Sequence, residues 1–285
     1  MKNYIKVFIL LLFIIVAVGA VLIFVKTQVA PPGDIVFKDQ YSAPLNADVE
    51  KVGVKPFPQC KDGYVKAFHK VNFMNEEGIL NDEQADELRV KVDTVYGNRV
   101  VAYAYRIFDS SAWPEADINL ISSTINDLKN SRLKNGKIGI TQEMGESFNK
   151  VESIIREYRS AWTFARNTGF RSVADASSRI HSIGNYRNRP YIRNNTALMS
   201  ALNNLPSAIA TSHYNYVAAQ VNKLGGYRSM SRSQFNSLVN DVVRVIEEYK
   251  NTGIYGGAKK SVSPLESRAE SLVDEANEYY SYDNY

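Results

Sequence analysis

TQEMGESFNKVESIIREYRSAWTFARNTG, the segment from Thr141 to Gly169, carries the clearest periodicity of this chain. Apolar side chains recur at alternating spacings of four and three residues, which places them on one face of an α-helix: Met144, Phe148, Val151, Ile155, Tyr158, Trp162 and Ala165. Thr141 suits the N-cap and Gly169 the C-terminal end of this helix. Such a stripe is stabilised mainly by packing against another apolar surface.

The same spacing predicts further helices at residues 82–108, 114–128, 210–224, 231–253 and 262–279. Few segments show the two-residue alternation of strands. We therefore expect an all-α fold, a multi-helix bundle of about six helices packed nearly antiparallel. A bundle is favoured over an extended coiled coil, because no long heptad register appears. The expected core includes Phe148, Ile155, Trp162, Phe235 and Val242.

Residues 7–25 read VFILLLFIIVAVGAVLIFV and contain no charged or strongly polar side chain. A helix of this length spans roughly 28 Å, close to the hydrocarbon thickness of a bilayer, and satisfies its own backbone hydrogen bonds there. We therefore expect residues 1–26 to form an uncleaved, single-pass N-terminal transmembrane anchor, which contacts the lipid bilayer through residues 7–25. A buried core helix is the weaker alternative.

A cleavable signal peptide is the more serious alternative to an anchor. The apolar region of a signal peptide is about 7–15 residues long, shorter than this run. Both candidate cleavage motifs are poor, because the one at residues 18–20 lies inside the apolar run and the one at residues 28–30 begins with Gln28. The flanking lysines give a slight preference for a cytoplasmic N-terminus, so we expect the bulk of the chain to be extracytoplasmic.

Residues 27–63 contain five of the nine prolines of the chain. Proline fixes φ and interrupts helices, so we expect a Pro-rich, extended linker that holds the following domain away from the bilayer. Residues 64–285 then form the helical bundle domain with an acidic, Tyr-rich C-terminal end. This end is either a recognition tail or a frayed helix end with Tyr279 in the core.

The sequence contains no HExxH, no GxSxG and no paired CxxC motif. His69, His181 and His213 are dispersed, and we interpret each as an ordinary surface or core residue, because metal sites need several clustered donors. Cys60, the single cysteine, has no sequence neighbour that would lower its pKa. We expect no catalytic residue, no metal site and no cofactor, and the sequence leans against an enzyme.

The charge distribution is unusual, because there is no Asp or Glu between Ala176 and Asn240. Arginine pairs bidentately with carboxylates and phosphates and stacks on rings, so this segment is a candidate anion-binding site. The ligand would be an anionic lipid, an anionic polymer, nucleic acid or an acidic protein. The predicted site residues are Arg179, Tyr186, Arg187, Arg189, Tyr191, Arg193, Arg228 and Arg232.

Internal pairing is the alternative interpretation of this acid-free segment. The last twenty residues of the chain carry a block of acids with one arginine: Glu266, Glu270, Asp274, Glu275, Glu278 and Asp283, against Arg268. These acids could lie beside the arginines within one bundle, since charged helix faces are usually solvated or paired.

Three functions remain open on this sequence. The first is a membrane-anchored, non-enzymatic helical domain that binds a protein or an anionic partner. The second is a hydrolase of envelope polymers whose site is assembled from scattered Glu, His and Tyr side chains, and a histidine beside a carboxylate in a polar cleft would favour it. The third is a structural or assembly component that acts by homo-oligomerisation.

Overall fold

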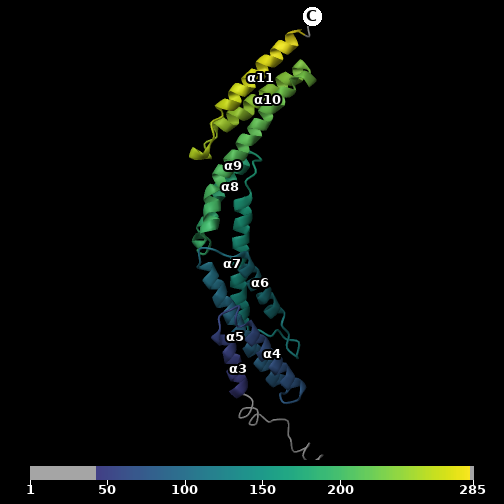
Figure 1. The fold of residues 1–285 in the computed structure, drawn as a ribbon, viewed down its shortest axis with the longest axis vertical. Helices are drawn as coiled ribbons and strands as arrows, with labels where there is room; N and C mark the ends of the chain where they lie inside the picture. The colour runs from purple at the N-terminus through teal and green to yellow at the C-terminus, as the bar shows by residue number, and fades with distance from the viewer. Residues whose placement is uncertain (1–42, 283–285) are drawn as a thin grey trace, which may run out of the picture. The chain divides into compact units, whose positions relative to one another are not determined.

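The structure, a computed structural model, describes residues 43–282, with side chains from residue 44 to residue 281. These residues are 79% helical, form nine α-helices labelled α3 to α11 (Figure 1) and contain no strand. One isolated antiparallel bridge joins Arg132 and Ile138. The predicted all-α helical bundle is therefore confirmed for this part of the chain.

The predicted anchor, residues 1–26, and the first part of the predicted linker lie outside the described residues. Between residues 43 and 282, no helix combines the length and the apolar character that crossing a bilayer requires. The transmembrane segment at residues 7–25 stays a prediction from the sequence.

The described residues divide into two units, and the division falls within α5 and α7. Unit 1 comprises residues 43–106 and 114–152, and unit 2 comprises residues 107–113 and 153–282. The sequence prediction was one bundle domain over residues 64–285, and the described part of the chain forms two compact units. The apolar stripe of α7 is buried on both sides of the boundary and continues through it without a break. The spacing of its apolar residues therefore does not reveal that the helix contributes to two separate cores.

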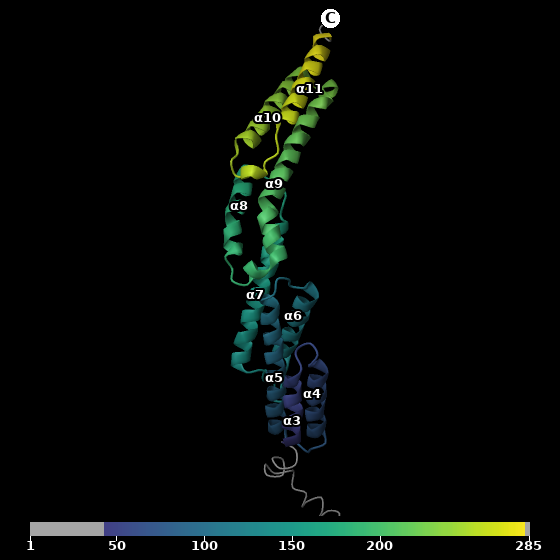
Figure 2. The ribbon, with the colours of Figure 1, turned by 60° about the vertical axis from the view of Figure 1, so that its left-hand side comes forward.

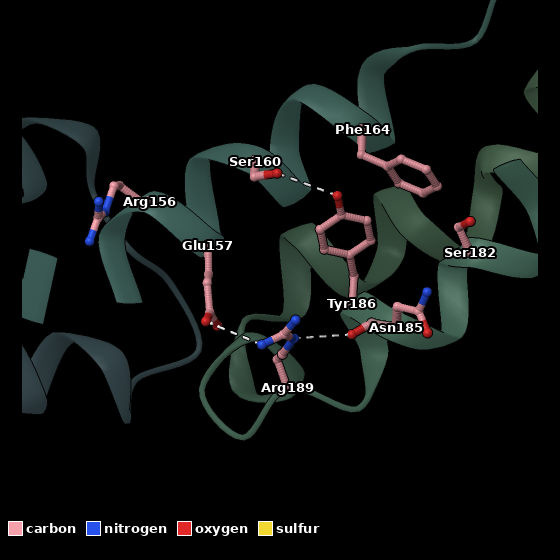
Figure 3. A pocket seen from close by; sticks show the side chains of 8 residues that line it. All are labelled: Arg156, Glu157, Ser160, Phe164, Ser182, Asn185, Tyr186 and Arg189. Atoms are coloured by element: carbon pink, nitrogen blue, oxygen red, sulfur yellow. Dashed lines mark hydrogen bonds and ion pairs between the residues drawn. The ribbon is translucent and has the colours of Figure 1, made fainter. Parts of the chain in front are cut away.

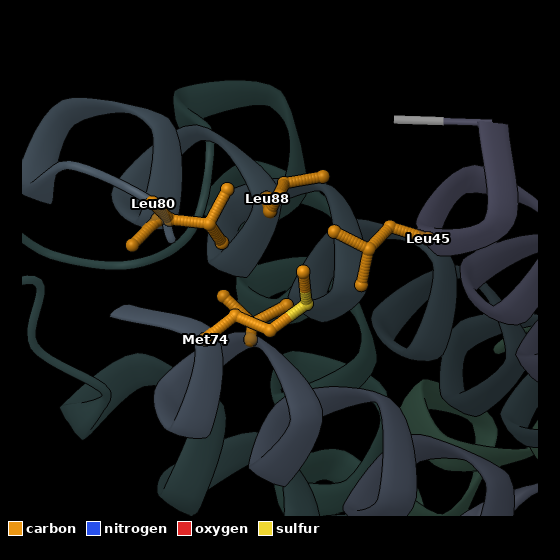
Figure 4. Close-up of a cluster of buried hydrophobic side chains, with 6 residues drawn as sticks. Leu45, Met74, Leu80 and Leu88 are labelled. Atoms are coloured by element: carbon orange, nitrogen blue, oxygen red, sulfur yellow. The ribbon is translucent and has the colours of Figure 1, made fainter. Parts of the chain in front are cut away.

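Unit 1 is built from five helices: α3 (Ala43–Val54), α4 (Lys61–Glu76), α5 (Asp82–Phe108), α6 (Glu115–Asn130) and the first turns of α7 (Gln142–Arg166). One cluster of buried aliphatic side chains joins α3, α4, α5 and the turn between the last two (Figure 4). It consists of Leu45, Val71, Met74, Leu80, Ala85 and Leu88.

Helix α3 shows that the prediction of an extended linker up to residue 63 is wrong for residues 43–54. Pro44 lies in the first turn of α3, where a backbone N–H has no helical partner, so it does not interrupt the helix. Leu45, Val49 and Val52 follow at helical spacing and are buried. The next two prolines lie between α3 and α4, and α4 already begins at Lys61.

Cys60 and Asp93 are among the ionisable side chains that unit 1 buries. Cys60 directly precedes α4 and is 2% exposed, and burial raises the pKa of its thiol. Asp93 of α5 is fully buried, and its carboxylate accepts hydrogen bonds from the Tyr64 hydroxyl at 2.9 Å and the Ser131 hydroxyl at 3.0 Å.

Unit 2 is arranged around its longest helix, α9. Helix α8 lies beside the first half of α9, and α10 and α11 lie beside its second half (Figure 2). Beyond α7, the elements are α8 (Val173–Arg187), η2 (Ile192–Asn194), α9 (Thr196–Lys223), η3 (Leu224–Ser229), α10 (Arg232–Asn251), η4 (Gly256–Ala258) and α11 (Ser263–Tyr282).

Four of the five predicted core residues are buried: Phe148, Ile155, Phe235 and Val242. Trp162 is only half-buried, which corrects the prediction for this residue. The Arg166 guanidinium covers one face of its ring at 4.7 Å, so a neighbour on the same helix screens the indole from water.

The C-terminal helix ends in a docked tyrosine. Tyr280 is buried, and its hydroxyl donates to the carbonyl oxygens of Tyr227 at 2.6 Å and Met230 at 3.0 Å. Tyr279, which one of the two alternatives for this end placed in the core, is half-buried and lies edge-on to the Tyr227 ring. Leu272 and Ala276 of the same helix are buried, and Tyr280 takes the last inward position of α11.

Candidate functional site

The structure separates the predicted anion-binding residues into three places within unit 2. Arg179 is buried in the middle of α8. The next five lie at the end of α8 and around η2: Tyr186, Arg187, Arg189, Tyr191 and Arg193. Arg228 and Arg232 lie beyond the other end of α9, whose 28 residues extend about 42 Å. The eight residues therefore do not form one site.

Arg179 has a structural role, which corrects its assignment to an anion-binding site. Its guanidinium donates to the carbonyl oxygens of Asn167 and Gly169 and forms an ion pair with Asp175 at 2.7 Å. Its side chain is 9% exposed. Carbonyls of the α7–α8 connection thus occupy the donors that an anion would need.

An open groove of 540 Å³ lies between α7 and α8 (Figure 3). The residues from α7 recur at helical spacing, as do those from α8 and the turn after it, so two helix faces oppose each other. The lining consists of Arg156, Glu157, Ser160 and Phe164 on one side, and Ser182, Asn185, Tyr186 and Arg189 on the other. Of the predicted residues, only Tyr186 and Arg189 are in it.

Two aromatic rings form an apolar wall of this groove. The Phe164 and Tyr186 rings lie 4.7 Å apart between centroids, with an interplanar angle of 34°. The Tyr186 hydroxyl lies 3.3 Å from the Ser160 hydroxyl, which orients the ring (Figure 3). This wall provides a flat surface for the apolar part of a ligand.

Two guanidinium groups and one carboxylate give the groove an excess of positive charge. Arg189 Nη1 lies 3.2 Å from Glu157 Oε1, and Arg189 Nε donates to the Asn185 carbonyl oxygen at 3.3 Å. The paired side chains are 52% and 41% exposed, and an ion pair so exposed contributes less than about 1 kcal/mol. Arg156 is exposed and has no ion-pair partner among the described residues. Both arginines are therefore available to an external anion.

Of the other predicted residues, Arg187, Tyr191 and Arg193 lie near the groove. Arg228 and Arg232 lie beyond the far end of α9. The backbone N–H of Arg193 donates to the Arg189 carbonyl oxygen at 3.1 Å, so this exposed arginine is one turn beyond the groove. Arg187 is half-buried, and the Tyr191 ring lies 5.9 Å from that of Phe108. Arg228 covers its neighbour Tyr227 at 5.7 Å, and Arg232 begins α10.

Within the described residues, no ion pair joins the acids of α11 to the arginines of the acid-free segment. Arg179 and Arg189 pair instead with Asp175 and Glu157, and Glu266 pairs with Lys250 at 2.8 Å. Internal pairing with the last helix, the alternative interpretation of the sequence, is therefore not observed between residues 43 and 282.

The histidines do not assemble a hydrolytic site. His213 is buried, stacks on Phe170 at 3.6 Å and shares a hydrogen bond of 3.1 Å with the Tyr255 hydroxyl. Burial, and to a smaller extent the charge of Lys259, lowers the pKa of His213 to about 4. His181 is exposed and contacts the Ser177 carbonyl oxygen at 2.8 Å. Neither histidine has a carboxylate partner in the described part of the chain, so no observation favours the hydrolase hypothesis.

Sequence reasoning missed the six other groove residues, because four of them come from a helix outside the acid-free segment. The sequence does contain a signal for the α7 side. Arg156, Ser160 and Phe164 recur every four residues beside the apolar stripe, so they share a second face of that helix. Which helix opposes this face depends on the packing.

Comparison with known proteins adds no assignment to this geometry: no family model, no curated protein and no solved structure matches the chain.

Proposed function

We propose that this chain is a membrane-tethered, non-enzymatic helical domain that binds an anionic partner in the groove between α7 and α8. The observation that carries the proposal is that two exposed arginines, Arg156 of α7 and Arg189 after α8, line the same groove as the Phe164–Tyr186 wall (Figure 3). A guanidinium beside an aromatic wall provides both bidentate hydrogen bonds and a surface for stacking.

The pairing of Arg189 with Glu157 supports exchange with a ligand. Because this ion pair is exposed, its loss costs less than about 1 kcal/mol. A ligand carboxylate or phosphate then replaces the Glu157 carboxylate on Arg189 and adds a contact with Arg156. Ser182 and Asn185 supply neutral polar groups at the edge of the same groove.

The tether in this proposal rests on the sequence of residues 7–25, whose length and uniform apolar character suit a bilayer span. A helical domain on such a tether meets its partner at the membrane surface, on the extracytoplasmic side according to the lysine distribution.

The test measures binding of a soluble polyanion to the full-length chain in non-ionic detergent micelles. Poly-L-glutamate supplies carboxylates, and inorganic polyphosphate supplies phosphates. Replacing Arg156, Arg189 and Arg193 by Gln removes three positive charges and keeps polar side chains of similar length. We expect binding at low salt to weaken about ten-fold or more, because each exposed contact contributes up to about 1 kcal/mol and each 1.4 kcal/mol is ten-fold.

The control variant replaces Lys223, Arg228 and Arg232 by Gln. It removes the same charge from the far end of α9, so it should change binding less than about three-fold if the groove is the site. Equal weakening by both variants would show general charge attraction without a specific groove. Undiminished binding by the Arg156, Arg189 and Arg193 variant would refute the proposal.

A further inference from the structure

The outer face of α11 carries a row of exposed acids. Glu270, Asp274 and Glu278 recur every four residues and are exposed, so they lie on one side of the helix. Among the described residues none of the three has an ion-pair partner. The ion pair that α11 does form, from Glu266 to Lys250, lies in its first turn.

The opposite face of α11 is anchored, so this acidic row has a fixed orientation. Leu272, Ala276 and Tyr280 are buried, and the two hydrogen bonds of the Tyr280 hydroxyl attach the helix to the segment from Tyr227 to Met230. The carboxylates therefore project from a firmly packed helix. Little conformational entropy is lost when such a helix binds a partner.

The acidic row and the basic groove lie along different halves of α9. Helix α11 packs against η3 and the part of α9 that precedes it, whereas the groove lies at the end of α8, near η2 (Figure 2). Since η2 and η3 flank a helix about 42 Å long, the two charged surfaces of one unit 2 do not meet. Both are left available to a second molecule.

We infer that the acidic face of α11 in one copy of this chain docks onto the basic groove of a second copy. This inference deepens the proposed function, because it names the partner of the same groove. The carboxylates of Glu270, Asp274 and Glu278 would meet the guanidinium groups of Arg156, Arg189 and Arg193. Complementary surfaces of this kind guide association and determine its register.

The contact joins two different surfaces, so it is heterologous. Each copy in a pair keeps one unoccupied groove or one unoccupied α11, and further copies can add. Anchoring in one bilayer would raise the effective concentration of the copies and favour this association.

The experiment uses the full-length chain in non-ionic detergent micelles, with two different affinity tags on two pools of protein. Sedimentation velocity measures association, and capture through one tag measures mixed complexes. The wild-type chain should associate at low salt, grow beyond a dimer with rising concentration, and separate in about 1 M salt, where the Debye length is about 3 Å.

Two charge-reversal variants test the pairing. In the groove variant Arg156, Arg189 and Arg193 are replaced by Glu, and in the α11 variant Glu270, Asp274 and Glu278 are replaced by Lys. Each variant alone should associate at least about ten-fold more weakly than wild type, because its groove and its α11 then carry like charges. A mixture of the two restores opposite charges and should recover association and mixed capture.

If circular dichroism shows that a charge-reversal variant does not fold, uncharged variants with Gln at the same positions are used in its place. With the same positions changed to Gln, each variant alone loses association. Their mixture still forms one-to-one pairs, because one variant keeps its α11 and the other keeps its groove. A wild-type chain that stays monomeric at low salt, or mixtures that fail to recover, would overturn the inference.

The α11 variant separates this inference from the proposed function. With Gln at these positions it leaves the groove intact and adds no positive charge, so it should lose self-association while still binding poly-L-glutamate. If the wild-type chain binds poly-L-glutamate but does not self-associate, the groove is an anion-binding site and the second copy is not its partner. Self-association with charge rescue, but without polyanion binding, supports the contact and refutes the broader function.

Discussion

At the residue scale, the most constrained side chain is Asp93. Burial raises the pKa of its carboxyl from 3.8 to about 6, although hydrogen bonds from Tyr64 and Ser131 and the charge of Arg89 act in the opposite direction. A side-chain carbon at Gly139 would lie 2.9 Å from Asp93 Oδ2, so the loop after α6 approaches this carboxylate closely because it has a glycine there.

Replacing Asp93 by Asn should stabilise the chain at high pH. Because the folded carboxyl has the higher pKa, its stabilising contribution is complete below about pH 4 and is lost as the pH rises through 6. Asn is uncharged, can accept from Tyr64 and can donate to Ser131. We expect the free energy of unfolding, relative to wild type, to rise by about 1–3 kcal/mol between pH 4 and pH 8.

Denaturant unfolding of both proteins at the two pH values measures this difference, since the other titrating groups are common to both. The same stability difference at pH 4 and pH 8 would show that Asp93 has an ordinary pKa in the folded chain.

The fate of single arginines shows a limit of sequence reasoning at this scale. The absence of acids from 176 to 240 correctly indicated a basic region, and Arg189 and Tyr186 lie in the groove. The same pattern assigned Arg179 to the site, but the guanidinium of Arg179 binds backbone carbonyls outside the groove. Composition reports the charge of a side chain, whereas its availability depends on which acceptors the fold brings to it.

At the scale of elements, helical spacing predicted most of the long helices, and the errors have local causes. Helix α9 begins at Thr196, with Asn195 as its N-cap, well before the predicted residue 210. It contains Pro206, which in sequence resembles a helix end. Its apolar stripe extends to both sides of the proline and is buried, so packing outweighs the missing N–H.

Replacing Ile155 by Ala tests the α7 stripe. Ile155 is 2% exposed, so the change removes buried methyl groups and leaves a cavity, at a cost of about 2–5 kcal/mol in the free energy of unfolding. Replacing the exposed Thr163 of the same helix by Ala is the control and should change stability by less than about 0.5 kcal/mol. Chemical denaturation measures both. Equal, small effects would place Ile155 outside the core.

At the scale of the whole molecule, the net charge of +4 conceals two opposite charge blocks. The sequence showed both blocks, but the internal pairing that it suggested is not found among the described residues. It could not show that the groove draws Arg156 and Glu157 from α7, or that the α11 acids form no ion pair with these arginines among the described residues, because both depend on helix packing. Periodicity specifies which face of a helix is buried but not which neighbour covers it.

The N-terminal segment yields a prediction for the full chain. We expect the protein to stay with the membrane fraction in alkaline carbonate, because residues 7–25 can hold a helix across the hydrocarbon core. A variant that lacks residues 1–26 should be released. Release of the full-length chain would contradict the anchor, and a mature N-terminus at Pro31 would indicate a cleaved signal peptide.

Because Cys60 is buried, a cysteine introduced on the surface of the wild-type chain can be labelled selectively with a fluorescent dye. The Cys60 thiol is enclosed before α4 and holds its proton more firmly than a free cysteine, and the chain has no other. Maleimide dyes react with thiolates, so they should not react with the protonated, buried Cys60. They should label a cysteine introduced on the surface. A donor at position 194 and an acceptor at position 277, both exposed and outside the two sets of charged residues, on separate pools of protein, would then report the distance between neighbouring copies in a native bilayer.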